Sequence, residues 1–140
     1  AVLGGRLIVE ALEAAARGGL APRRQPEAGV NYARKIDKAE ARIDWQQTAA
    51  QIDRQVRAFN PWPVAETRWQ GRQLRIWEAE NVVAGSGAEP GRVLEADGGR
   101  LLVATGEGAL ALHRVQMAGR RAVTTAEFLN AHPLAGARLG

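Results

Sequence analysis

The sequence contains no cysteine, which excludes disulfides and thiolate metal sites and fits a reducing compartment. Its only histidines, His113 and His132, stand far apart, and no cluster of His, Asp and Glu has the spacing of a metal site. No apolar run reaches the roughly 20 residues that a membrane-spanning helix requires. The apolar segment near the N-terminus carries Arg6 and Glu10, which distinguishes it from a signal peptide. These absences favour a cytoplasmic protein with no membrane association and no metal.

Lysine is also scarce, and arginine supplies almost all of the positive charge. Lys35 and Lys38 are the only lysines among 19 basic residues, and the formal net charge is +4. A basic balance permits binding to nucleic acid or to an acidic membrane surface without demonstrating either. With 140 residues, 46% of them hydrophobic, the chain suits one domain with a core plus an appendage.

The N-terminal part of the sequence predicts a helix followed by a linker. Apolar residues recur at helical spacing over residues 1–17, and Gly18-Gly19 supplies the stop signal. The start has no Ser, Thr, Asp or Asn cap, which is typical of the last helix of something longer. Residues 21–41 combine two prolines with dense charge, which predicts a basic linker.

After the linker the pattern changes to short helices and short strands. Thr48 and Gln51 form a capping-box pattern for a helix running to about Ala58, and Thr124 and Glu127 form another for a short last helix. Strands are predicted at residues 64–69, 73–77, 92–96, 100–104 and 109–115, separated by glycine-rich turns. The final residues, 138–140, are expected to fray. The sequence thus predicts a mainly β domain over residues 42–140, an OB-like small barrel of about five strands with flanking short helices.

Several motifs, taken in order, resemble the methionyl-tRNA formyltransferases, the family that formylates the methionine carried by initiator tRNA. The two strongest are Arg42-Ile43-Asp44-Trp45 and Arg57-Ala58-Phe59-Asn60-Pro61-Trp62-Pro63. The others are Tyr32-Ala33-Arg34-Lys35-Ile36, Pro90-Gly91, Ala104-Thr105-Gly106 with Gly108, and Gln116-Met117-Ala118-Gly119-Arg120-Arg121. Val64 is a departure, because the family usually has glycine there.

The resemblance implies a division of labour. Residues 1–20 resemble the last helix of the family's N-terminal catalytic domain, and residues 42–140 resemble its C-terminal tRNA-binding domain. Initiator methionyl-tRNA and the N-terminal formyltransferase domain of the same protein are the implied partners, and a monomer is expected. The family's catalytic Asn, His and Asp and its 10-formyltetrahydrofolate site belong to the N-terminal domain, and no segment here matches those motifs. The expectation is a docking fragment for translation initiation that is inactive alone, with no catalytic, metal or cofactor-binding residue of its own.

A set of cations supplies the candidates for contact with tRNA phosphates, which require only well-placed positive charge. They are Lys35, Lys38, Arg42, Arg72, Arg120 and Arg121. If residues 35–42 are helical, Lys35, Lys38 and Arg42 share one face. Arg120 and Arg121 lie in a predicted loop, where adjacent arginines can grip two phosphates. For each group the alternative is ordinary charge facing solvent.

Two tryptophan motifs each have a binding and a packing interpretation. Trp45 could stack on a base, but a Trp at an element boundary more often packs, with Asp44 pairing with Arg42 or capping a turn. The Asn60–Pro63 segment could be a recognition loop. Two prolines around one Trp favour instead a rigid turn with Trp62 buried.

Other functions stay open from the sequence. Formyltransferases acting on nucleotide sugars or on folate carry similar barrels, which would serve as scaffolds without RNA contact. An autonomous single-stranded nucleic-acid binder would need aromatic residues on an open sheet face, where Trp69 and Trp77 are the candidates. A self-sufficient enzyme would need a catalytic constellation that the sequence does not offer.

Overall fold

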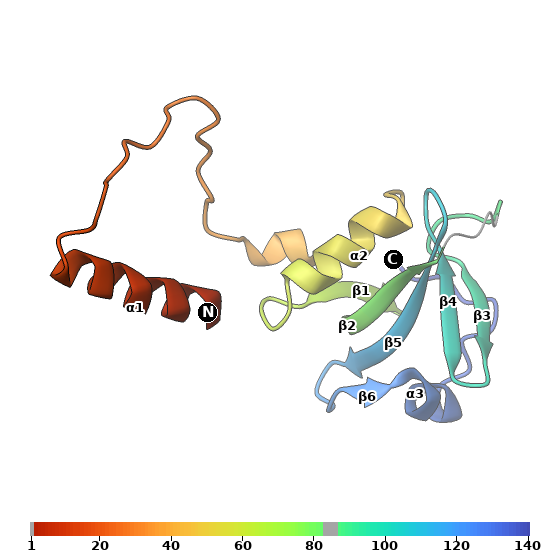
Figure 1. Ribbon diagram of the computed structural model, residues 1–140. Coiled ribbons are helices and arrows are strands. Elements are labelled where there is room, and N and C mark those ends of the chain that lie inside the picture. The colour runs from red at the N-terminus through yellow and green to blue at the C-terminus, as the bar shows by residue number, and fades with distance from the viewer. Residues whose placement is uncertain (1, 83–86) are drawn as a thin grey trace. The chain divides into compact units, whose positions relative to one another are not determined.

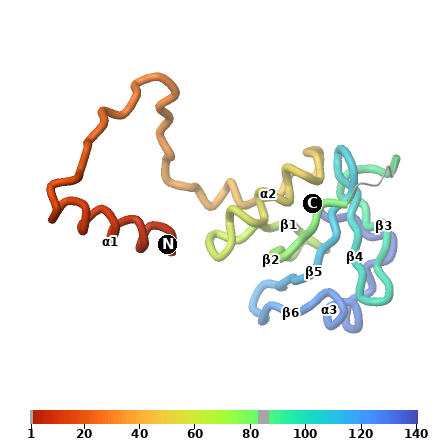
Figure 2. The backbone as a smooth tube through the Cα atoms, viewed as in Figure 1, coloured from red at the N-terminus to blue at the C-terminus, as the bar shows by residue number. Residues whose placement is uncertain are grey.

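A computed structural model describes residues 2–82 and 87–140, which fall into two compact units. The division lies between Lys35 and Ile36. Figure 2 traces the backbone from red at the N-terminus to blue at the C-terminus. Residues 36–41, which the sequence assigns to the linker, therefore belong to the second unit. The glycine-rich segment at residues 84–91, between two of the predicted strands, falls partly outside the described residues.

The first unit consists of the predicted helix and an irregular segment. Helix α1, Val2–Ala16, ends where Gly18 adopts a left-handed conformation with φ +68°. The N–H of Gly19 then donates to the carbonyl of Ala14 at 2.8 Å, and that of Gly18 to Ala15 at 3.0 Å, a pattern that terminates helices. No residue of α1 is buried.

The second unit is an antiparallel sheet with short helices on it (Figure 1). The strands are β1 (Ala65–Trp69), β2 (Arg72–Val82), β3 (Val93–Asp97), β4 (Arg100–Ala104), β5 (Ala109–Met117) and β6 (Val123–Thr124). They follow the order β1-β2-β5-β4-β3, and β6 pairs with β5. The predicted mainly β, OB-like barrel is confirmed, with β6 as an additional strand. Strand β2 extends beyond its predicted end because it pairs with β5 as far as Val82, with a register shift around Trp77.

Three helical segments accompany the sheet: η1 (Lys38–Ala41), α2 (Ala49–Ala58) and α3 (Thr125–Ala131). Both predicted capping boxes are present, at Thr48 and at Thr124. Helix α2 contributes Ile52 and Val56 to the core, where each is at most 1% exposed. The core is completed mainly by β-strand side chains, among them Leu74, Ile76, Val103, Leu110, Leu112 and Val115.

The C-terminal tail joins the two ends of the sheet, so the prediction that it frays is wrong. Leu139 is 1% exposed, which anchors the tail by burying an apolar side chain. On one side Val93 of β3 donates its N–H to Ala137 at 2.8 Å. On the other side Gly140 donates its N–H to Arg68 of β1 at 3.0 Å. The tail therefore closes the barrel between its two edge strands.

Two glycines of the motifs lie where backbone segments approach closely. A Cβ added to Gly106 would lie 1.8 Å from the carbonyl oxygen of Gln46, and one added to Gly91 would lie 2.4 Å from that of Leu139. Gly106 also donates its N–H to Trp45 at 2.8 Å and to Gln47 at 2.9 Å. Only glycine allows these segments to meet. This close approach explains why the two motifs carry glycine at positions 91 and 106.

Candidate nucleic-acid interface

Lys38 and Arg42 lie at the two ends of η1, which is the only helical segment between residues 35 and 42. The side chain of Asp37 caps η1 by accepting from the N–H of Ala39 at 3.0 Å. At the other end the backbone becomes extended at Arg42, and Ile43 donates its N–H to Glu66 of β1 at 2.8 Å. The condition for a shared face of Lys35, Lys38 and Arg42 is therefore not met, because a cap and a strand pairing confine the helical segment to Lys38–Ala41. Lys35 belongs to the other unit.

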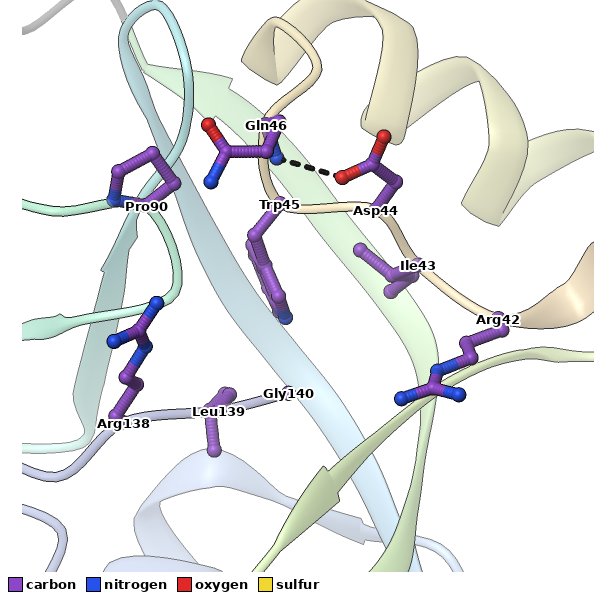
Figure 3. Close-up of a pocket in the computed structure, with 9 residues that line it drawn as sticks. All are labelled: Arg42, Ile43, Asp44, Trp45, Gln46, Pro90, Arg138, Leu139 and Gly140. Carbon is purple, nitrogen blue, oxygen red and sulfur yellow. Dashed lines mark hydrogen bonds between the residues drawn. The ribbon is translucent and has the colours of Figure 1, made fainter.

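Arg42 lines a pocket of about 620 Å³ beside the C-terminal tail (Figure 3). Arg138 lines the same pocket, so two exposed guanidinium groups flank it. The guanidinium of Arg138 lies 3.4 Å from the carboxylate of Glu89. Asp44 turns to its own backbone, accepting from the N–H of Gln46 at 3.0 Å, and therefore caps a turn.

Trp45 is part of the barrel core and is not available for stacking. It is 5% exposed, and its Nε1–H donates to Oγ1 of Thr67 at 3.0 Å. A buried Trp whose N–H finds a partner packs as a structural residue. The packing interpretation of the Arg42–Trp45 motif is confirmed for Trp45, and Arg42 remains as its exposed cation.

Arg72, Arg120 and Arg121 come together around a second pocket of about 680 Å³. They lie far apart in sequence, but the β1–β2 turn and the segment after β5 are neighbours because Leu74 pairs with Met117. All three side chains are exposed at the rim, and the pocket is also lined by apolar residues. The apolar lining residues are Met117, Val123, Phe128 and Ala131.

The carboxylate of Glu127 also lines this second pocket. Its pKa is lowered, chiefly because it accepts a hydrogen bond from the backbone N–H of Thr124, then because it accepts one from the Thr124 hydroxyl. Arg121 adds a smaller electrostatic contribution from 3.4 Å. Glu127 is therefore ionised at neutral pH, and Arg121 already has a partner, which makes it a weaker phosphate ligand than its neighbour Arg120.

Trp62 is 51% exposed, so its predicted burial is wrong. The turn that carries it is held at both ends, since Asn60 Nδ2 donates to the carbonyl of Trp77 at 3.0 Å and Val64 N–H to that of Phe59 at 2.9 Å. Val64 takes the buried position instead, 3% exposed, with a left-handed φ of 71°. Such a conformation suits glycine far better than a β-branched residue.

The two histidines and Trp69 are engaged with neighbouring residues of this chain. His113 lies on the surface with its Nε2 3.4 Å from Glu80, and the ring of His132 packs against Phe128 at a centroid distance of 4.6 Å. Trp69 is 6% exposed and contacts Phe128 edge-on, so it does not offer a stacking face. Within residues 2–82 and 87–140 no three His, Asp or Glu side chains are grouped to hold a metal ion. In the same part of the chain, every helix is too short or too polar to cross a membrane.

Sequence reasoning missed two exposed residues of these surfaces, Arg138 and Trp62. Arg138 lies in a tail whose position depends on barrel closure, for which no local signal exists. Trp62 lies in a motif that the sequence singled out, but its exposure depends on which side of the turn faces the core.

The fold and the exposed arginines define a small β-barrel domain with cationic pockets. Residues 35–133 match the family described as formyl transferase, C-terminal domain. The chain belongs to this family.

Relatives extend the similarity over nearly the whole chain. It is 48% identical over 138 residues to the methionyl-tRNA formyltransferase of Methylococcus capsulatus, covering 99% of this chain and 44% of that protein. It is 53% identical over 127 residues to that of Methylibium petroleiphilum, covering 91% and 40%. The chain thus spans less than half the length of these curated relatives.

Solved structures show the same fold. A variant of HypX from Aquifex aeolicus superposes with a TM-score of 0.67 at 24% identity, covering 88% of this chain and 22% of that one. HypX in complex with tetrahydrofolic acid gives a TM-score of 0.62 at 25% identity, covering 87% and 22%.

Proposed function

We propose that this chain is the tRNA-docking part of a methionyl-tRNA formyltransferase, acting as a monomer in the cytoplasm during translation initiation. The observation that carries the proposal is the 48% identity to a protein of that name over 99% of this chain. The similarity includes α1 and the linker as well as the barrel, so the order of these segments along the chain is shared. The partners are initiator methionyl-tRNA and the N-terminal formyltransferase domain of the same protein.

The proposed mechanism is electrostatic. Lys38 and Arg42 at the ends of η1, and Arg72 and Arg120 at the second pocket, are exposed and can approach backbone phosphates. Lys35 adds a cation from the preceding unit. Phosphate contacts fix orientation without reading sequence, so the barrel's role is to set the angle at which the tRNA is held.

Catalysis and 10-formyltetrahydrofolate are assigned to the N-terminal domain of the whole protein. A folate site needs a few well-placed polar groups to recognise the pterin. Within the described residues the buried polar side chains are Thr67, Thr105 and Thr125, and each already has a hydrogen-bond partner. These three buried groups are therefore not free to recognise a pterin, and we derive no catalytic step from this chain.

The second candidate function is that of a scaffold barrel in a nucleotide-sugar or folate formyltransferase, without RNA contact. The fold likeness to HypX is compatible with it, but at 24% identity that likeness concerns the fold alone. The names of the relatives at 48% and 53% identity favour the tRNA enzyme.

The test is a titration of the 140-residue chain with initiator tRNA across a salt series. The charge-reversal variant changes Lys35, Lys38 and Arg42 to Glu. We expect the affinity of the wild type to fall steeply with salt and the variant to lose binding. The slope of log K against log salt concentration should decrease by about 1 for each lost contact.

The control for net charge reverses Arg54, Arg100 and Arg114, which are exposed and lie outside both arginine pockets. This control should retain most of the affinity. If both variants lose binding to the same extent, the loss is explained by net charge and not by the positions of Lys35, Lys38 and Arg42. Wild-type protein that fails to bind even at low salt would contradict the docking function and favour the scaffold.

A further inference from the structure

We propose that the pocket lined by Trp62 and Lys38 binds one unpaired nucleotide of an RNA by stacking its base on Trp62. The inference deepens the proposed docking function and rests on it for the identity of the RNA. The pocket has a volume of about 360 Å³ and lies between the Asn60–Pro63 turn, η1 and strand β2. This volume falls within the roughly 300–1,000 Å³ range of small-ligand pockets.

The stacking surface is the ring of Trp62. Trp45 and Trp69 are 5% and 6% exposed, whereas Trp62 leaves half of its surface to solvent. Its turn is tied to β2 by the hydrogen bond from Asn60 to the carbonyl of Trp77, and prolines on both sides restrict the backbone. A ring held in this way loses little conformational freedom when a base stacks on it, and stacking tolerates any base.

The charges around the ring match the rest of a nucleotide. Lys38 lines the pocket, is exposed, and forms no ion pair with any described residue. Arg75 also lines the pocket, and its Nε is buried without a hydrogen-bond partner among the described residues. The guanidinium of Arg75 adds a second positive charge to the lining, which attracts a phosphate.

The single carboxylate in the pocket does not oppose an anionic ligand strongly. Glu66 accepts a hydrogen bond from Nε2 of Gln73, which occupies one of its oxygens. Lys38 and Arg75 carry two positive charges against this one negative charge. An exposed aromatic ring beside net positive charge favours a nucleotide over an apolar segment of another protein.

The first experiment compares tRNA binding by wild type, Trp62→Leu and Trp62→Phe. Leucine keeps an apolar side chain without a stacking face, and we expect it to weaken binding about 5- to 140-fold, the usual value of one stacked base. Phenylalanine should retain most of the affinity. The salt slope should stay unchanged in both, because neither removes a cation.

A matched pair of cation variants tests the phosphate contact. Lys38→Gln should lower the salt slope by about 1. Arg54→Gln, which removes an exposed charge from α2 outside the pocket, should leave the slope unchanged. Equal effects of the two variants would contradict a phosphate contact at Lys38.

A second readout separates this site from the docking function. Adenosine monophosphate is titrated into the chain while the indole N–H signals are followed by NMR, with Trp62→Phe identifying the Trp62 signal. A saturable shift of that signal, with Trp45 and Trp69 unmoved, supports the site even if the chain fails to bind tRNA and the docking function is lost. Trp62→Leu binding tRNA as tightly as wild type overturns the site while docking stands. A chain that binds neither tRNA nor the nucleotide overturns both.

Discussion

The two units of the chain use similar apolar side chains in opposite ways. In α1 of the first unit, Leu3, Leu7 and Leu12 are 68%, 53% and 63% exposed. In the second unit Leu74 and Leu110 are 0% exposed. Burial rather than apolar content stabilises a fold, so the resistance of this chain to unfolding resides in residues 36–140. The first unit contributes charge and an apolar helix face, but no core.

The largest expected effect comes from Gly106→Ala, since its Cβ would overlap the carbonyl oxygen of Gln46. Relieving the overlap requires the two backbone segments to separate and the hydrogen bonds to Trp45 and Gln47 to break. We expect a loss of about 4 kcal/mol in the free energy of unfolding, measured by urea denaturation.

The same substitution in the first unit should act in the opposite direction. Gly5 lies inside α1 with no atom within 4 Å of an added Cβ. Gly5→Ala should favour the helix by about 1 kcal/mol, seen as a gain in helical circular dichroism, and leave the barrel's unfolding free energy unchanged. A change in barrel stability equal to that of Gly106→Ala would contradict the contrast between the units.

A second pair of variants removes the same side chain from each unit. Leu74→Ala empties a fully buried position and should cost about 3 kcal/mol, measured as a lower urea midpoint with an unchanged slope. Leu7→Ala removes an exposed side chain and should change the free energy of unfolding by less than about 0.5 kcal/mol. A comparable loss from Leu7→Ala would show that α1 shares the barrel's cooperative transition.

The smallest expected effect is a pH dependence within the barrel unit. The folded-state pKa of Glu127 is lowered, so its stabilising contribution is present above pH 4.5 and is lost as pH falls through the folded pKa. Glu127→Gln keeps an acceptor for Thr124 but does not titrate. The stability difference between wild type and Glu127→Gln should therefore shrink below pH 4.5, as measured by thermal unfolding at a series of pH values. A stability difference that grows on acidification would show that folding raises the pKa of Glu127 instead of lowering it.

Local signals in the sequence predicted the elements of the barrel well. The capping boxes at Thr48 and Thr124 placed the starts of α2 and α3, because a cap is a hydrogen bond between residues three apart. The turn at Asp97-Gly98-Gly99 likewise placed the hairpin of β3 and β4, since its geometry depends on its own residues.

Features that depend on distant partners were not predictable in this way. Strand β6 has only two paired residues, so no period could reveal it. The tail at residues 137–140 is ordered by its contacts with Arg68, Gly91 and Val93, which its own sequence does not announce.

The residues of the candidate site show the same contrast between local signals and features that depend on distant partners. Lys38, Arg42, Arg72 and Arg120 were predictable as exposed cations because charge at turns and linkers faces solvent. The meeting of Arg72 with Arg120 and Arg121 required the pairing of β2 with β5. The exposure of Trp62 required knowing that Val64 fills the core beside it.

The closure of the barrel by its tail has a consequence for hydrogen exchange. The amides of Val93, Leu139 and Gly140 are protected only by hydrogen bonds between the tail and the segments beside it, a junction that we call the seam, whereas β2 and β5 share a long ladder. Local opening of the tail would expose the seam amides without unfolding the core. Within the barrel, the amides of the seam should therefore exchange with deuterium first. The barrel should open locally at the seam before it unfolds globally.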